Sequence, residues 1–192
     1  KLMCLAEYKL GRALGFKNAL CMTLGTGVGG SIIISGSLYR GANNAAGEIG
    51  HLPINEKGPR CNCGGSGCLE TYIGNNRIIS EAKKMFKRNI SLEELSTLAK
   101  KKNKQAESIW LKVGMHLGIA LVGIVNLLNL DAIIIGGGVA NAGQILFDKV
   151  RETVKKQAMS VQARHIKIFK AKLGNDAGLI GAAILVKEGM RG

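Results

Sequence analysis

Hydrophobic and polar positions along the chain change their spacing several times, and each change predicts an element. The apolar run ALCMTL at residues 19–24 predicts a buried strand, and SIIISGSLY at 31–39 predicts a second strand with a tight Ser-Gly turn inside it. The glycine-rich segment GTGVGG between these two runs predicts the turn of a hairpin. A further buried strand is expected in DAIIIGGG, which begins at Asp131 and ends in glycines.

Apolar residues recur at helical spacing through most of the remaining chain. The opening residues, KLMCLAEYKLGRALG, predict an amphipathic helix that is already under way at Lys1, so we expect the chain to be a fragment. Further helices are expected at about 77–87, 92–101, 104–128, 141–158 and 177–188, and a short strand at 165–171. Because strands and helices alternate late and a hairpin comes early, the pattern predicts a mixed α/β layer architecture.

The apolar content of the chain is sufficient for a sizeable core. Its 192 residues are 46% hydrophobic and include 27 glycines, which favours a glycine-punctuated α/β domain over a disordered segment. The most apolar segment, residues 114–130, is short for a membrane span and carries His116, Asn126 and Asn129. We therefore expect a buried core helix there and no membrane partner.

The net charge of +14 raises the question of a nucleic-acid partner. The lysines gather mainly in residues 83–104 and 149–172, where they alternate with apolar residues at helical spacing. This pattern is typical of solvated helix faces. No aromatic residues are interleaved for base stacking, which argues against nucleic acid as a partner.

The segment RCNCGGSGCLE at residues 60–70 places three cysteines within eight positions, ten residues after a histidine. One imidazole and three thiolates would complete a tetrahedral Zn²⁺ shell, and such a closed shell makes a metal structural rather than catalytic. A disulfide would leave one cysteine over, and the odd total of five cysteines favours free thiols in a reducing, cytoplasmic compartment. The expected metal ligands are His51, Cys61, Cys63 and Cys68.

Two carboxylates accompany the cysteines. Glu48 lies three residues before His51, and Glu70 lies two residues after Cys68. If a metal folds the loop, both carboxylates and the imidazole can face one pocket, where they would suit the vicinal hydroxyls of a sugar. Alternatively, Glu70 is the first-turn carboxylate of a helix and Glu48 is a surface loop residue. The spacing favours neither interpretation.

Two glycine turns are candidates for nucleotide contacts. GTGVGG contains G-x-G-x-x-G, but a strand follows it where a dinucleotide fold needs a helix, so we reject that fold. The turn can still present backbone N–H groups and the Thr26 hydroxyl to a phosphate, or it is only a tight hairpin. Gly137 and Gly138 follow a buried strand, where they border a ligand or mark close helix–strand packing.

Taken together, these segments resemble those of the ROK family of sugar kinases, repressors and uncharacterised proteins, and the resemblance covers essentially the whole chain. LGTGVGGSIIISGSLYRG resembles the family's second phosphate segment, and AGEIGH followed by CNCGGSGCLE is similar to its defining motif. IIIGGGV and NDAGLIGAA resemble its nucleotide-side strand and its closing helix. The resemblance implies an actin-like, ribonuclease H-like ATPase fold, with residues 1–192 as the larger C-terminal lobe and a zinc and sugar loop at 41–74.

The resemblance also implies roles for individual residues. Structural zinc would be bound by the four ligands already named, and sugar hydroxyls by Glu48, His51 and Glu70. The implied reaction is that of a glucokinase, in which Mg²⁺–ATP phosphorylates the C6 hydroxyl of a hexose. The sugar itself stays open among glucose, N-acetylglucosamine, N-acetylmannosamine and allose. The nucleotide contacts would be Thr26 and Gly27 at the phosphates and Gly137 and Gly138 at the adenosine.

The family's catalytic aspartate has no counterpart in this chain. It stands in an Asn-Asp-x-Asn segment before a helix that ends Ala-Leu-Ala-Glu, and Cys4-Leu5-Ala6-Glu7 fits that ending. The aspartate is therefore expected two residues before Lys1, and the N-terminal lobe with its Asp-x-Gly-Gly-Thr loop is expected to be missing. We expect no catalytic residue here, no turnover by the isolated chain, and an apolar surface, including part of the closing helix, that faces the missing lobe.

A second member of the same family remains an alternative. A ROK transcriptional repressor or sugar sensor that lacks its helix-turn-helix could keep the zinc motif and the sugar residues. The kinase is favoured because GTGVGG and IIIGGG both look intact. A free-standing zinc module for nucleic acid would need basic and aromatic neighbours, of which only Arg60 and Tyr72 are present. The family also implies a homo-oligomer formed through this lobe.

Overall fold

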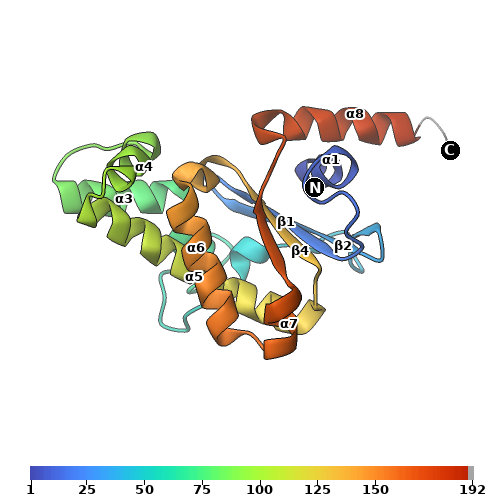
Figure 1. Cartoon of the computed structure of the whole chain (residues 1–192), viewed down its shortest axis with the longest axis horizontal. Coiled ribbons are helices and arrows are strands. Elements are labelled where there is room, and N and C mark those ends of the chain that lie inside the picture. The colour runs from blue at the N-terminus through green and yellow to red at the C-terminus, as the bar shows by residue number, and fades with distance from the viewer. Residues whose placement is uncertain (190–192) are drawn as a thin grey trace.

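A single five-stranded sheet organises the chain (Figure 1). The computed structural model describes residues 1–189. The strand order is β3-β2-β1-β4-β5, in which the first three strands are antiparallel and β1, β4 and β5 are parallel, as a mixed α/β architecture requires. The strands are β1 Ala19–Leu24, β2 Val28–Ile34, β3 Ser37–Tyr39, β4 Ala132–Gly136 and β5 Lys167–Lys170.

Helices cover both faces of this sheet. They are α1 Leu2–Leu10, α2 Glu70–Ile73, α3 Asn75–Phe86, α4 Leu92–Lys100, α5 Lys104–Leu128, α6 Gln144–Gln157, α7 Ser160–His165 and α8 Ala177–Gly189. The predicted helix at 104–128 is confirmed to the residue. The predicted helix at 141–158 is wrong at its start, because Gly143 has φ +84° and ends a 3-10 turn before α6 begins. The predicted strand at 165–171 is shorter, because α7 occupies its first residue.

The larger core lies between the sheet and the helices α3 to α6. Leu20, Met22 and Leu24 of β1 face this core, while Ala19 and Cys21 face α1 on the other side, as the alternation of a strand dictates. By length and composition α5 could cross a membrane, but its buried residues, Trp110 among them, pack in this core. The structure therefore supports the predicted core helix.

Two glycines allow α5 and α6 to approach closely. A Cβ atom on Gly114 would lie 2.8 Å from the Cβ of Lys149, and one on Gly118 would lie 2.5 Å from the Cβ of Thr153. Contacts this short do not occur between carbon atoms, so a larger residue at either position would push the helices apart.

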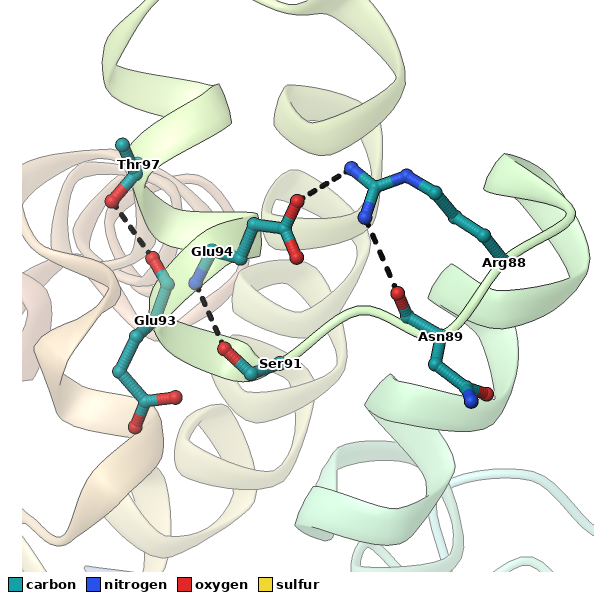
Figure 2. Close-up of polar contacts among 6 residues, drawn as sticks. All are labelled: Arg88, Asn89, Ser91, Glu93, Glu94 and Thr97. Atoms are coloured by element: carbon teal, nitrogen blue, oxygen red, sulfur yellow. Dashed lines mark hydrogen bonds and ion pairs between the residues drawn. The ribbon is translucent and has the colours of Figure 1, made fainter.

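The lysine-rich segment around α4 is held by local polar contacts at the surface (Figure 2). The Ser91 hydroxyl accepts a hydrogen bond from the N–H of Glu94 at 3.1 Å, which caps α4. The Glu94 carboxylate also pairs with Arg88, and the hydrogen bond from Arg88 lowers the pKa of Glu94. Arg88 is exposed and Glu94 is half-buried, and the nearby Lys83, Lys84, Lys87 and Lys100 are exposed, which agrees with the prediction of solvated helix faces.

A buried carboxylate joins α1 to the segment that leads into α8. The Glu7 side chain is fully buried, and its two oxygens accept hydrogen bonds from the N–H groups of Arg12 at 2.7 Å, Lys172 at 2.7 Å and Leu173 at 2.8 Å. A Cβ on Gly11 would collide with this carboxylate. The first helix therefore ends at Leu10, and its predicted extension to residue 15 is wrong.

The closing helix α8 lies beside α1 on the second face of the sheet (Figure 1). Gly181 allows this contact, because a Cβ there would lie 2.0 Å from the carbonyl oxygen of Leu2. Elsewhere on α8, Leu179, Leu185 and Val186 are exposed, and Leu179 keeps 77% of its surface accessible. A helix that is apolar on all sides is usually covered on all sides. This is the kind of surface that the sequence predicts for the closing helix.

Candidate functional site

Two glycine turns lie next to each other at the carboxyl ends of β1 and β4. The two strands are paired in parallel, with Thr23 opposite Gly136, so the chain leaves both strands at the same edge of the sheet. Gly137 has φ +88°, and a Cβ on it would lie 2.3 Å from the carbonyl oxygen of Leu24. Glycine is required here because the turn packs against the end of strand β1, whereas the close packing considered from the sequence was between a helix and a strand. The same contact places Gly137 and Gly138 beside the turn that contains Thr26 and Gly27.

Asn75 connects these turns, although no sequence motif points to this residue. Its N–H donates to the carbonyl oxygen of Gly25 at 2.9 Å. Its Nδ2 atom would lie 4.0 Å from a Cβ built on Gly138. The Oδ1 atom of Asn75 is buried and has no hydrogen-bond partner in the described residues. A ligand with a hydroxyl or amino group between the turns could satisfy it.

The cysteine loop, residues 51–70, folds back on itself beside the β1–β2 turn. Isolated bridges pair Pro53 with Cys68 and Arg60 with Ser66, and the N–H of Cys61 donates to Gly65 at 2.9 Å. The closest approach between two backbone segments of this loop requires a glycine. Gly67 has φ +68°, and a Cβ there would lie 1.7 Å from the carbonyl oxygen of Asn55.

The folded cysteine loop brings the four predicted metal ligands together. Their donor atoms all lie within 4.8 Å of one another. The Cys61 Sγ lies 3.5 Å from the His51 Nδ1, and the Cys63 Sγ lies 3.6 Å from the Cys68 Sγ. Two sulfurs bound tetrahedrally at about 2.3 Å would be about 3.8 Å apart, so the donor set fits an ion of this size.

The thiols of the cluster differ in their environments. Burial, with the neighbouring thiols, raises the pKa of Cys68 to about 12. A hydrogen bond from the backbone of Gly65 lowers the pKa of the exposed Cys63 thiol. Because metals bind the thiolate, an ion entering this cluster must displace at least the Cys68 proton.

Glu70 links the cysteine loop to the phosphate-type turn. It is the first residue of α2, two positions after Cys68, and its Oε2 accepts a hydrogen bond from the N–H of Val28 at 2.8 Å. A Cβ on Gly27 would lie 2.6 Å from the same oxygen. Glu70 is therefore a first-turn carboxylate of α2, as one of the two interpretations had it, and its contact with a sugar stays a prediction.

The predicted sugar residues do not share one cavity. Glu48 is exposed and lines a cavity of about 200 Å³ with Thr23 and Gly29, whereas Glu70 lines a different cavity of about 410 Å³ with Thr26 and Gly27. His51 ends the 3-10 turn that begins after Glu48. Within residues 1–189, no hydrogen bond directly joins the side chains of Glu48, His51 and Glu70.

The mixed sheet, with paired glycine turns at one edge and a cysteine–histidine cluster beside them, is consistent with the actin-like ATPase fold. The chain belongs to the ROK family, because the protein-family model described as "ROK family" matches its residues 1–189. This confirms the family that the sequence motifs indicate.

Individual relatives include both enzymes and regulators. A glucokinase of Halalkalibacterium halodurans is 37% identical, over 96% of this chain and 60% of that protein. An N-acetylglucosamine repressor of Escherichia coli O157:H7 is 29% identical, over 98% of this chain and 48% of that protein. The solved structure of a ROK family glucokinase from Streptomyces griseus in complex with glucose and AMPPNP is 30% identical, with a TM-score of 0.88, over 96% of this chain and 65% of that one. The chain thus spans about 60% of the length of the curated glucokinases that it matches.

Proposed function

We propose that this chain supplies the sugar, nucleotide and metal contacts of an ATP-dependent hexose kinase that phosphorylates a glucose-like sugar at C6. The observation that carries the proposal is the hydrogen bond from Val28 to Glu70. This hydrogen bond joins a carboxylate suited to sugar hydroxyls to a turn suited to phosphate. The sugar, which accepts the phosphoryl group, and the ATP, which donates it, would therefore meet at this point. The relatives named glucokinase support the same activity.

The metal in this proposal is structural Zn²⁺, bound by the cysteine loop. Its four ligands leave no open position, so it would brace the loop and take no part in the chemistry. Loss of the brace would release Glu70, which lies two residues after Cys68 in the chain. The ligands would be His51, Cys61, Cys63 and Cys68.

The remaining residues bind and orient the substrates. Mg²⁺–ATP supplies the phosphoryl group. The Thr26 hydroxyl and the N–H of Gly27 would donate to its phosphates, and Gly137 and Gly138 would leave room for the adenosine. The sugar hydroxyls would be held by Glu48, His51 and Glu70. This requires that substrate binding join the cavity lined by Glu48 to the cavity lined by Glu70.

The general base would lie outside this chain, two residues before Lys1, as the family motif implies. The 192-residue chain alone is then a larger C-terminal lobe without turnover. The exposed apolar side chains of α8 would face the other lobe. The working protein would be a cytoplasmic homo-oligomer whose partners are a sugar and ATP, with no nucleic acid contact through this chain.

A ROK repressor is the second candidate, and the similarity to the N-acetylglucosamine repressor favours it. Two observations favour the kinase instead. The glucokinase of Halalkalibacterium halodurans has the higher identity of the two relatives, and both glycine turns lie at the same edge of the sheet.

Replacing Glu70 with glutamine tests the proposed sugar contact. The substitution keeps the shape of the side chain but removes its charge, and a hydrogen bond to a charged group contributes about 1.5–3 kcal/mol. We expect hexose affinity, measured by calorimetry on the 192-residue chain, to fall roughly 10- to 100-fold. Glu56→Gln, an exposed carboxylate of the same loop, is the control and should change affinity less than about twofold. Equal hexose affinities for the Glu70→Gln variant and the unmodified chain would refute the contact.

A further inference from the structure

Two buried cysteines lie side by side where α1 packs on β1 (Figure 1). Cys4 belongs to α1 and Cys21 to β1, and each keeps only 1% of its surface accessible. The Sγ of Cys21 lies 4.0 Å from the carbonyl oxygen of Cys4, and the Sγ of Cys4 lies 3.8 Å from the carbonyl oxygen of Ser31. Both thiols are free and stand apart from the metal cluster, so the sugar, nucleotide and metal contacts leave them without a role.

The two thiols also interact with each other. A hydrogen bond with the Cys4 thiol is the largest of the causes that raise the pKa of Cys21 well above its ordinary value, and burial is the next. A disulfide needs Cβ atoms that point toward each other and Cα atoms within about 7 Å. Side chains that share a hydrogen bond already point toward each other, so a bond between these sulfurs needs little movement of the backbone.

A cavity of about 200 Å³ gives small molecules access to this pair, because both cysteines line it. Lys1 and Glu48, which are exposed, line the same cavity and connect it to solvent. One molecule of liquid water takes up about 30 Å³, so a cavity of this size admits hydrogen peroxide. It is too small for a peptide disulfide such as oxidised glutathione, which leaves a small peroxide as the oxidant that reaches the thiols.

The thiol of Cys4 is not needed to build α1. The sequence Cys4-Leu5-Ala6-Glu7 stands where the family motif has Ala-Leu-Ala-Glu. Alanine is the better helix former of the two residues. The fold of α1 therefore does not explain why a second thiol faces Cys21.

We propose that Cys4 and Cys21 form a redox modification site, at which a peroxide converts the two thiols into a disulfide that joins α1 to β1. The Cys4 sulfur attacks one oxygen of hydrogen peroxide, the O–O bond breaks, and a sulfenic acid and one water form. The Cys21 sulfur then attacks the sulfenic sulfur, an S–S bond forms, and the hydroxyl group leaves with the Cys21 proton as a second water. The two sulfurs lose two electrons in total, and the peroxide accepts them.

The order of the two steps follows from the environments of the thiols. The thiolate is the reactive form, and the raised pKa of Cys21 keeps that thiol protonated, so Cys4 attacks first and Cys21 second. Disulfides in a reducing compartment are usually transient and redox-sensing, which agrees with a bond that forms only on exposure to peroxide. The proposal goes beyond the proposed function and does not depend on it, since the reaction involves neither sugar nor ATP.

Peptide mapping of the 192-residue chain after exposure to hydrogen peroxide tests this site. The chain is denatured, its remaining thiols are alkylated, and it is digested with trypsin. Trypsin places Cys4, Cys21 and the three loop cysteines in separate peptides, at residues 2–9, 18–40 and 61–77. We expect peptides 2–9 and 18–40 to be recovered as a linked pair that has lost the mass of two hydrogen atoms and that separates on reduction with dithiothreitol.

Two alanine variants test the order of the steps. In Cys21→Ala, the Cys4 thiol should still be oxidised but should stop at the sulfenic acid or a higher oxide, because no second thiol follows. In Cys4→Ala, which restores the residue of the family motif, Cys21 should remain a thiol under the same exposure. Circular dichroism of both variants before oxidation confirms that they are folded.

Three results would overturn the proposal. The first is recovery of peptides 2–9 and 18–40 unlinked, with both cysteines alkylated. The second is a link from either peptide to 61–77 that is as frequent as the link between them, which would indicate unspecific oxidation. The third is oxidation of Cys21 in Cys4→Ala as fast as in the unmodified chain, which would show that Cys21 does not react through Cys4.

Discussion

Replacing Cys68 with serine is expected to abolish stoichiometric zinc binding and, with it, hexose binding. Cys68 is buried and contributes one of four donor atoms, and no other cysteine or histidine belongs to the cluster in residues 1–189. Loss of a supporting residue near a metal already costs about 10- to 100-fold in affinity, so loss of a ligand should cost more than about 100-fold. The measurement is the ratio of zinc to protein after dialysis, together with limited proteolysis of the cysteine loop.

Cys21→Ala is the matched control for this experiment. Cys21 is equally buried, but it lies in β1 and faces α1 rather than the cluster. Its replacement should lower stability while one zinc per chain is retained. A Cys68→Ser variant that keeps one zinc per chain and an intact loop would contradict the structural role of the metal.

Replacing Glu7 with glutamine is expected to lower the free energy of unfolding by about 3 kcal/mol, a large part of the 5–15 kcal/mol typical of domains. Three backbone N–H groups converge on this fully buried carboxylate. Glutamine can accept at only one oxygen, so its NH₂ group would face an N–H donor, either that of Arg12 or those of Lys172 and Leu173. The remaining hydrogen bonds would also lose their charge assistance.

Urea unfolding measures this effect, and Glu152→Gln provides the control. The Glu152 carboxylate is exposed and pairs with Lys149 on the surface of α6, so its loss should cost less than about 1 kcal/mol. A Glu7→Gln variant as stable as the Glu152→Gln variant would show that the buried carboxylate does not anchor α1 to the segment before α8.

The spacing of apolar residues and glycines predicted the elements that depend mainly on neighbouring residues in the chain. The hairpin follows from two apolar runs around a glycine turn, and the Ser35–Gly36 turn between β2 and β3 was visible in the sequence. The helix at 104–128 follows from its long apolar periodicity. The short helices α2 and α7 could not be predicted, because segments of four and six residues depend on the contacts around them.

The features of the site that could not be predicted from the sequence depend on contacts between residues far apart in the chain. The clustering of the four candidate metal ligands was predictable, because cysteine spacing within a short loop restricts where the thiols can lie. The significance of Asn75 was not predictable, because it depends on α3 beginning beside the β1–β2 turn. The separation of Glu48 and Glu70 into different cavities was equally invisible, since it depends on how residues 41–70 wrap around the turn.

The most direct test of the central claim is a coupled assay for ATP-dependent hexose phosphorylation by the complete gene product that contains this chain. The panel is glucose, N-acetylglucosamine, N-acetylmannosamine and allose. We predict phosphorylation at C6 of at least one of them, loss of that activity in Glu70→Gln, and no turnover by the 192-residue chain alone. Failure of the complete gene product to phosphorylate any of the four sugars, combined with specific binding to operator DNA, would contradict the kinase and support a sugar-sensing repressor.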